Sequence, residues 1–173
     1  LEGDTQNPYT QVRAKQKTLV VSLTSNRGLC GAFNSNIIKK TRQLIDHDFS
    51  EQDVSLITIG KKGSEVLEKT EKIIGAHNAV FDDLNYDNVG QIAQIIMDKF
   101  AAQSFDQVVL VYNQFKNAAT QIVEVEPFLP IVAELNDSVS ASADYIFEPS
   151  KREIINDLLP KSLKMQLYKA VRD

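Results

Sequence analysis

Short apolar runs alternate with helical patterns along most of this 173-residue chain. Runs typical of buried strands occupy residues 18–23, 54–59 and 107–112, and a weaker one occupies residues 72–76. The run at 18–23 is expected to be apolar on both faces, as a central strand of a parallel sheet is. The segments between these runs carry apolar residues at helical spacing, which predicts helices that connect parallel strands.

Three helices are expected between the strands. The first is predicted to be capped by Asn34 or Ser35, the second is short and capped by Ser64, and the third spans about residues 88–104. The first helix is expected to bury one stripe, made of Ile37, Ile38, Thr41, Leu44 and Ile45.

The last strand is predicted to run against its neighbour. Residues 113–119 are expected to turn the chain, and residues 121–127 alternate apolar and charged positions, typical of a half-exposed strand. This link is too short for a crossover helix, so the two strands are antiparallel. The order βαβαβαββ predicts an α/β sandwich with a mostly parallel sheet and one antiparallel edge.

The C-terminal segment has a helical pattern of its own. Residues 150–153 read as a capping box, and an apolar stripe then continues to Val171. Pro160 is expected to kink or restart this helix, because proline removes one helical hydrogen bond. No cap follows Asp173, which suggests a longer helix that was truncated.

The chain is therefore expected to have three parts. Residues 1–17 lack a sustained period and predict a lead-in, residues 18–149 an α/β domain, and residues 150–173 a truncated helix.

Composition narrows the class of protein. The hydrophobic share of 43% and charged share of 24% are ordinary for a globular domain. A net charge of −4 argues against broad nucleic-acid binding, which usually needs a basic face. The single cysteine excludes an internal disulfide or a multi-cysteine metal site. No apolar run approaches the roughly 20 residues of a membrane helix, and the lead-in is too polar for a secretory signal.

The glycine loop after the first strand is the first candidate site. A dinucleotide-binding fingerprint needs three glycines, whereas this loop has Gly28 and Gly31. Cys30 would lie near a helix N-terminus, which lowers a thiol's pKa, but only His47 and His77 are available as bases and neither lies in a recognisable motif. A packing cysteine is the favoured interpretation.

A second glycine turn and two pairs of neighbouring carboxylates are the other candidate sites. The segment GKKG at residues 60–63 matches the loop with which KH modules clamp nucleic acid, but it follows a predicted strand, so a strand-to-helix turn is favoured. The carboxylate pairs Asp82–Asp83 and Asp46–Asp48 point in different directions and indicate neither an acid/base pair nor a metal site.

Four segments together resemble the gamma subunit of F-type ATP synthases. The segment SNRGLCGAFNSNI at residues 25–37 is similar to the hallmark of that family. The others are IGKKG at 59–63, VVLVYNQFKNAATQ at 108–121 and DYIFEPSKREIINDLLPKSLKMQLYKA at 144–170. The resemblance implies a three-layer α/β/α sandwich with a five-stranded, mostly parallel sheet whose last strand is antiparallel.

The resemblance also implies a mechanical function. Gamma subunits turn inside a ring of alpha and beta subunits and couple proton flow through the c-ring to ATP synthesis, while catalysis belongs to the beta subunits. No catalytic residue, cofactor or metal is therefore expected in this chain. The long N-terminal helix of the family is missing here, and the C-terminal helix stops near Asp173. The alternative is a nucleotide-binding α/β domain that uses the Gly28–Gly31 turn, with KH-type RNA binding third.

The implied partners are the epsilon subunit, the c-ring, and the alpha and beta subunits. By resemblance, the loop residues Arg27, Gly28, Leu29, Cys30 and Gly31 contact a beta subunit. The strand at 121–127 is expected either to dock epsilon or to be a solvated edge, and the C-terminal helix to promote self-association. The implied location is peripheral, on the cytoplasmic face of a bacterial inner membrane, with the mitochondrial matrix or chloroplast stroma as alternatives.

Overall fold

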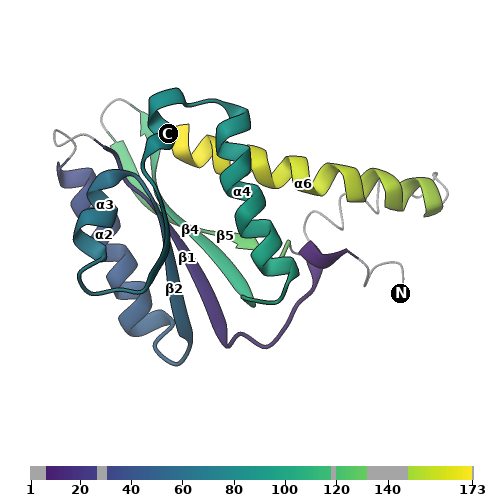
Figure 1. The fold of residues 1–173 in the computed structure, drawn as a ribbon, viewed down its shortest axis with the longest axis horizontal. Helices are drawn as coiled ribbons and strands as arrows, with labels where there is room; N and C mark the ends of the chain where they lie inside the picture. The colour runs from purple at the N-terminus through teal and green to yellow at the C-terminus, as the bar shows by residue number, and fades with distance from the viewer. Residues whose placement is uncertain (1–6, 27–30, 118–119, 132–147, 173) are drawn as a thin grey trace.

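A computed structural model of the chain describes residues 7–26, 31–117, 120–131 and 148–172 (Figure 1). Five strands form one sheet in the order β3-β2-β1-β4-β5. The strands are β1 (Lys17–Leu23), β2 (Asp53–Ile59), β3 (Ile73–His77), β4 (Gln107–Asn117) and β5 (Thr120–Leu129).

Helices cover both faces of the sheet. Figure 1 shows α2 and α3 on one face and α4 and α6 on the other, which confirms the three-layer α/β/α architecture. The helices are α2 (Gly31–Gln43), α3 (Lys61–Leu67), α4 (Tyr86–Ala101) and α6 (Glu148–Arg172), with short turns η1 (Pro8–Thr10), η3 (Leu44–Asp48) and η4 (Ala79–Asp83).

The pairing of the strands follows the predicted order. β1 pairs in parallel with β2 and β4, β2 pairs in parallel with β3, and β4 pairs antiparallel with β5. The chain moves from β1 outward to β3 and then returns to β4 on the other side of β1. The change of direction between β1 and β4 is the topological switch point, where ligands bind in nucleotide-binding α/β proteins.

The central strand β1 is buried on both faces, one of them apolar throughout and the other mixed. Leu19, Val21 and Leu23 pack into the larger core, which lies under α4 and α6. The alternate positions include the buried hydroxyls of Thr18 and Ser22, which face α2 and α3. On the α2 side, the predicted apolar character is confirmed at Val20, which joins a second apolar cluster, and is wrong at Thr18 and Ser22.

Two helices begin three residues or more before their predicted caps. α2 begins at Gly31, so Asn34 lies inside the helix, and its amide instead bonds Ser25. α3 begins at Lys61, and the Ser64 hydroxyl donates to the Lys61 carbonyl within the helix. For α3, contacts with the segment after β1 replace the local side-chain cap.

The third predicted helix, α4, is confirmed with shifted ends. Its N-cap is Asn85, whose Oδ1 accepts a hydrogen bond of 2.8 Å from the backbone N–H of Asn88. The helix ends at Ala101, and Gln103 then adopts a positive φ of 65° that breaks the helical path. The weak strand is also confirmed, because β3 pairs with β2.

The antiparallel edge is longer than predicted. β4 continues to Asn117, and Asn113 lies opposite Val123 of β5. The turn expected at residues 113–119 is wrong for 113–117, because pairing across the hairpin overrides their turn-prone composition; residues 118–119 lie outside the described residues. The half-exposed character of β5 is confirmed, since Ile122 is 40% exposed.

Helix α6 begins at Glu148, two residues before the expected capping box at residue 150. The helix continues through Pro160 without a break, so a restart at that position is wrong. The predicted stripe divides into two groups. Leu163 and Leu167 are buried against the sheet and α4, whereas Ile154 and Leu158 are exposed.

Candidate functional site

The candidate loop joins the end of β1 to the start of α2. Arg27, Gly28, Leu29 and Cys30 lie outside the described residues, and Gly31 is the first residue of α2. The structure therefore describes the residues on either side of the loop, called the mount below, and not residues 27–30 themselves.

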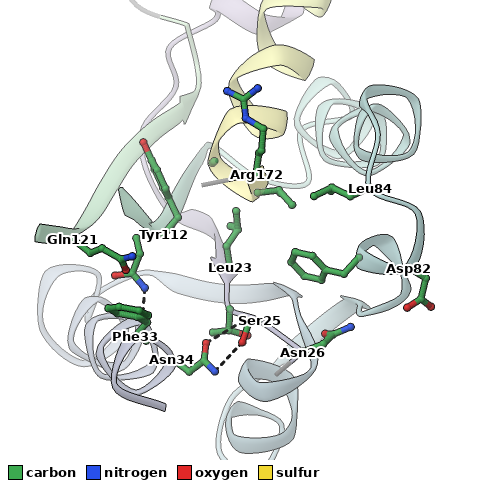
Figure 2. A pocket seen from close by; sticks show the side chains of 15 residues that line it. Leu23, Ser25, Asn26, Phe33, Asn34, Asp82, Leu84, Tyr112, Gln121 and Arg172 are labelled. Carbon is green, nitrogen blue, oxygen red and sulfur yellow. Dashed lines mark hydrogen bonds between the residues drawn. The ribbon is translucent and has the colours of Figure 1, made fainter. Parts of the chain in front are cut away.

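Ser25 and Asn34 hold the two ends of the loop together. The backbone N–H of Ser25 donates to Asn34 Oδ1 at 3.1 Å, and Asn34 Nδ2 donates to Ser25 Oγ at 3.1 Å (Figure 2). One helical turn of α2 is also fixed to β4, because Asn113 Nδ2 donates to the Phe33 carbonyl at 3.3 Å. The residues before and after the loop are thus held by hydrogen bonds to each other and to β4; these linked residues are called the frame below.

The same frame continues to the start of α3. The backbone N–H of Lys61 donates to Asn26 Oδ1 at 2.7 Å. The N–H of Lys62 donates to the Ser25 carbonyl at 3.1 Å, and the N–H of Gly63 donates to Thr24 Oγ1 at 2.8 Å. Residues after β1 therefore satisfy donors that the first turn of a helix otherwise leaves free.

Two glycines allow this close approach of α3 to β1. Gly60 has a φ of 110°, and a Cβ there would lie 2.1 Å from the Thr24 carbonyl oxygen. A Cβ at Gly63 would lie 2.9 Å from Thr24 Oγ1. Both positions need glycine for the contact as it stands, since real Cβ atoms do not approach other atoms so closely.

This geometry contradicts the KH interpretation of residues 60–63. The segment is a turn from β2 into α3, as the sequence favoured, and its N–H groups already donate to protein oxygens. Lys61 and Lys62 have solvent-exposed side chains within 4 Å of Glu65. The backbone N–H groups of this turn are therefore not available to bind a phosphate.

A cleft of about 580 Å³ lies beside the mount, over the carboxyl end of β1 and the middle of β4 (Figure 2). Its lining brings together the end of β1, the start of α2, η4, β4 and the last turn of α6. Asp82 and Arg172 are the charged side chains among the described lining residues. The other described lining residues are Leu23, Thr24, Ser25, Asn26, Phe33, Asn34, Phe81, Leu84, Tyr112, Asn113, Gln121, Ala170 and Val171.

The cleft lies at the switch point, but its chemistry differs from that of a dinucleotide site. The lining is mainly apolar and amide, with one cationic group, Arg172. A dinucleotide site of this fold class places the pyrophosphate at a glycine turn and helix N-terminus, with an acidic residue for the ribose. The described lining does not reproduce that set.

The two histidines considered as bases lie in different places. His47 is in η3, separated from Gly31 by the whole of α2, about 20 Å along the helix at 1.5 Å per residue. That distance excludes a direct contact between His47 and the start of α2. His77 ends β3 at the same edge of the sheet as the loop, and burial lowers the pKa of its imidazole.

The described part of the chain has neither a cluster of metal ligands nor a helix that could span a membrane. No group of three metal-ligating side chains occurs there, and Asp82–Asp83 and Asp46–Asp48 lie in the separate turns η4 and η3. None of the helices in the described ranges combines the length and apolarity that crossing a membrane requires.

The sequence did not reveal the residues that brace the loop. Thr24, Asn26, Asn34 and Gly63 act through contacts between segments far apart in the chain. The available signal was Gly60 directly after a strand, which indicates a tight turn but does not name its partner.

Comparison with known proteins decides the family. A family profile described as ATP synthase matches residues 1–173. The ATP synthase gamma chain of Flavobacterium johnsoniae is 55% identical over 174 residues, and that of Flavobacterium psychrophilum is 51% identical over 173. The chain belongs to the ATP synthase gamma family. Each match covers 100% of this chain and 60% of the relative, so the chain spans about three fifths of these gamma chains.

Solved structures with the same fold are parts of ATP synthases. One, titled as the central stalk and c-ring of the Tetrahymena thermophila mitochondrial enzyme, has a TM-score of 0.67 at 23% identity. The match covers 98% of this chain and 75% of the Tetrahymena chain. The rotor of the Euglena gracilis mitochondrial enzyme gives a TM-score of 0.63 at 19% identity, covering 91% of this chain and 60% of that one. At such identities these likenesses establish the fold alone.

Proposed function

We propose that this chain is the globular body of a central-stalk rotor subunit, which couples proton flow through a c-ring to ATP synthesis in an alpha/beta hexamer. The observation that carries the proposal is the gamma-family match along the whole chain, with relatives named as gamma chains at 55% and 51% identity. In this proposal the subunit performs no bond chemistry, and the catalytic sites lie on beta subunits.

The described structure suits a part that transmits force. Helices pack on both faces of the sheet, and hydrogen bonds tie the end of β1 to α2 and α3. Closely packed protein interiors have low compressibility and transmit strain. The residues on either side of the loop are therefore held by this frame.

The loop at residues 27–31 is proposed as a contact surface for a beta subunit, with Arg27, Gly28, Leu29, Cys30 and Gly31 as its residues. An arginine guanidinium presents a planar set of donors that suits a carboxylate on a partner. We expect Arg27→Ala to leave the body folded and to weaken coupling in the assembled enzyme. Unchanged ATP synthesis by a full-length Arg27→Ala subunit would contradict this assignment.

The proposed partners are epsilon, the c-ring, and the alpha and beta subunits. The titles of the similar structures name a central stalk with c-ring, and OSCP, F1 and c-ring, for the Tetrahymena and Euglena enzymes. The relatives at 51% identity and above are bacterial, which supports a place on the cytoplasmic face of a bacterial inner membrane. In isolation, the chain is expected to self-associate through α6, where Ile154 and Leu158 are 47% and 50% exposed.

Reconstitution tests the proposal. A full-length subunit with this body is combined with alpha, beta, epsilon and membrane sectors from a related bacterium, and ATP-driven proton pumping is measured. Restored pumping is expected. Loss of pumping with a correctly assembled complex would contradict the proposal, as would a rise in melting temperature of the chain with ATP or NAD, which favours a nucleotide-binding domain.

A further inference from the structure

Residues 7–17, called the strap below, lie across one end of the body before β1 begins. In Figure 1 the strap is the purple segment between the end of α4 and the first half of α6. Hydrogen bonds join it to four separate elements: α6, the end of β5, the end of α4 and the start of β4. The strap therefore connects parts of the chain that are distant in sequence.

One end of the strap holds α6. Asn7 Nδ2 donates to Asn156 Oδ1 at 2.9 Å, and the buried Asn7 side chain also caps η1 by accepting from the Tyr9 N–H at 2.9 Å. The Tyr9 carbonyl accepts from the N–H of Ile131 at 2.7 Å, just beyond β5. Because its cap and this backbone bond fix Asn7, its amide offers α6 a defined position.

The other end of the strap is anchored in the body through Arg13. Its guanidinium donates to the carbonyls of Phe100 and Phe105, where α4 ends, and lies 4.5 Å from the centroid of the Phe100 ring. A cation at a helix C-terminus is favourable because the last carbonyls carry partial negative charge. Arg13 thus caps α4 from a different segment of the chain.

Asp106 completes this anchor. It pairs with Arg13 at 3.2 Å and accepts from the backbone N–H groups of Gln16 (3.0 Å) and Lys17 (2.9 Å). Burial alone would raise the pKa of Asp106. The hydrogen bonds from Lys17, Gln16 and Arg13, together with the Arg13 charge, outweigh burial, so the pKa of Asp106 lies below its ordinary value. The carboxylate therefore stays ionised and bound at neutral pH.

The strap meets α6 in the first half of the helix. Figure 1 shows this half extending beyond α4, and Ile154 and Leu158 on it are exposed, whereas burial begins at Leu159. In the described residues, the Asn7–Asn156 bond is the hydrogen bond that ties this half to the rest of the chain. Among the described residues, the core contacts of α6 lie in its second half, at Leu163 and Leu167.

We propose that the strap fixes the direction of α6 on the body, with Asn7 and Asn156 as positioning residues for the transmission of torque between α6 and the α/β body. This inference rests on the proposed rotor function. The body end of the strap is anchored by the Arg13–Asp106 pair, and the α6 end by one amide–amide bond. Force on α6 is resisted at Asn156, three residues or slightly less than one helical turn before the buried Leu159.

A double-mutant cycle at the α6 end separates this function from folding. Asn7→Asp keeps the acceptor that caps η1, and Asn156→Asp keeps the acceptor that Asn7 Nδ2 uses. Each single variant retains one amide to donate across the contact. The double variant has two carboxylates and no donor, so its effect exceeds the sum of the single effects if the contact matters. Asp157→Asn is the matched control, because Asp157 pairs with Lys161 within α6.

The readouts use the full-length subunit in the assembled enzyme. Spin labels at Ile154→Cys, an exposed position on the first half of α6, and Lys69→Cys on the opposite face, in a Cys30→Ser background, report the spread of distances between this half of α6 and the body. Protons pumped per ATP hydrolysed are measured separately with Cys30 intact. We expect the double variant to broaden the distance distribution and to lower this ratio about twofold or more, with hydrolysis retained.

The outcomes distinguish the two proposals. Singles and the Asp157→Asn control that match the unchanged chain, with a defective double variant, support the strap. A double variant that equals the singles in both measurements overturns it. If the unchanged subunit assembles but supports no pumping, the rotor function itself is overturned, while the distance measurement still reports whether the strap holds α6.

Discussion

The two faces of β1 use the same strand for different purposes. On the α4/α6 face, Leu19, Val21 and Leu23 join a large apolar core. On the α2/α3 face, Thr18 and Ser22 alternate with Val20, and the residue after the strand is Thr24. All seven of these side chains are buried, so the difference lies in chemistry and not in exposure.

The hydroxyls of Thr18, Ser22 and Thr24 each have a specific partner. Ser22 Oγ lies 2.6 Å from Thr41 Oγ1 of α2, and Thr24 Oγ1 accepts from Gly63 of α3 at 2.8 Å. Thr18 Oγ1 bonds the side chains of Gln52 and Gln107. Directional bonds of this kind hold one relative placement of the elements, whereas apolar contact alone tolerates repacking.

The comparison assigns a different role to each face. The apolar face supplies most of the burial that drives folding, and it docks α6. The hydroxyl face sets where α2 and α3 lie along β1, and hence the position of the loop between β1 and α2. Substitutions on the two faces are therefore expected to differ in kind as well as in size.

The largest effect is expected on the apolar face. Leu19 is fully buried, so Leu19→Ala removes buried methyl groups and leaves a cavity, at a cost of about 2–5 kcal/mol in unfolding free energy. Urea unfolding of the two proteins measures it. Val12→Ala is the control, because Val12 is 73% exposed and its truncation should change stability by less than about 0.5 kcal/mol. Equal effects at both positions would contradict the assigned core.

Gly60→Ala is expected to have the next largest effect. The new Cβ would meet the Thr24 carbonyl at 2.1 Å, at a backbone φ of 110° that other residues rarely adopt. Backbone strain of this kind costs about 1–3 kcal/mol. The loss should concentrate at the contact, so hydrogen exchange at the amides of Lys61 and Gly63 should accelerate more than exchange in α4. Uniform acceleration would indicate simple global destabilisation.

A smaller effect is expected at the hydroxyl pair. Ser22→Ala leaves the buried Thr41 hydroxyl without its partner, at a cost of about 1–3 kcal/mol. Adding Thr41→Val removes the orphaned hydroxyl, so the double variant should be more stable than Ser22→Ala alone. Thermal unfolding of the two single variants and the double variant closes the cycle. Additive losses would show that the two hydroxyls contribute independently of each other.

The sequence was sufficient for the architecture because that depends on local patterns. The apolar runs of β1, β2 and β4, and the short link before β5, gave the strand types and the antiparallel edge. The true starts of α2 and α3 were missed because they depend on Asn34 and Thr24 meeting residues from other segments. A single sequence read locally carries no signal for such pairings.

The site shows the same division. The glycine loop was singled out from its residues, and the resemblance implied the contact role proposed for it, but the residues that support it were not predictable. The Asn26 contact with Lys61 spans 35 positions, and the Arg13 contact with Asp106 spans 93. Neither polar residue stands out in sequence, because Asn and Arg are ordinary in loops and lead-in segments.

The smallest effect is expected at Thr58, which lies on the neighbouring strand β2 and on the same α2/α3 side of the sheet as Thr18 and Ser22. Its side chain is fully buried, and Oγ1 has no hydrogen-bond partner within the described residues. Thr58→Val keeps the shape and removes a hydroxyl whose desolvation is not repaid, so stability should stay constant or rise by up to about 1 kcal/mol. Thermal unfolding beside Ser22→Ala provides the contrast, since Ser22 does have a partner. A loss at Thr58 as large as that at Ser22 would mean that the hydroxyl face depends on both groups, and that the distinction between paired and unpaired hydroxyls is wrong.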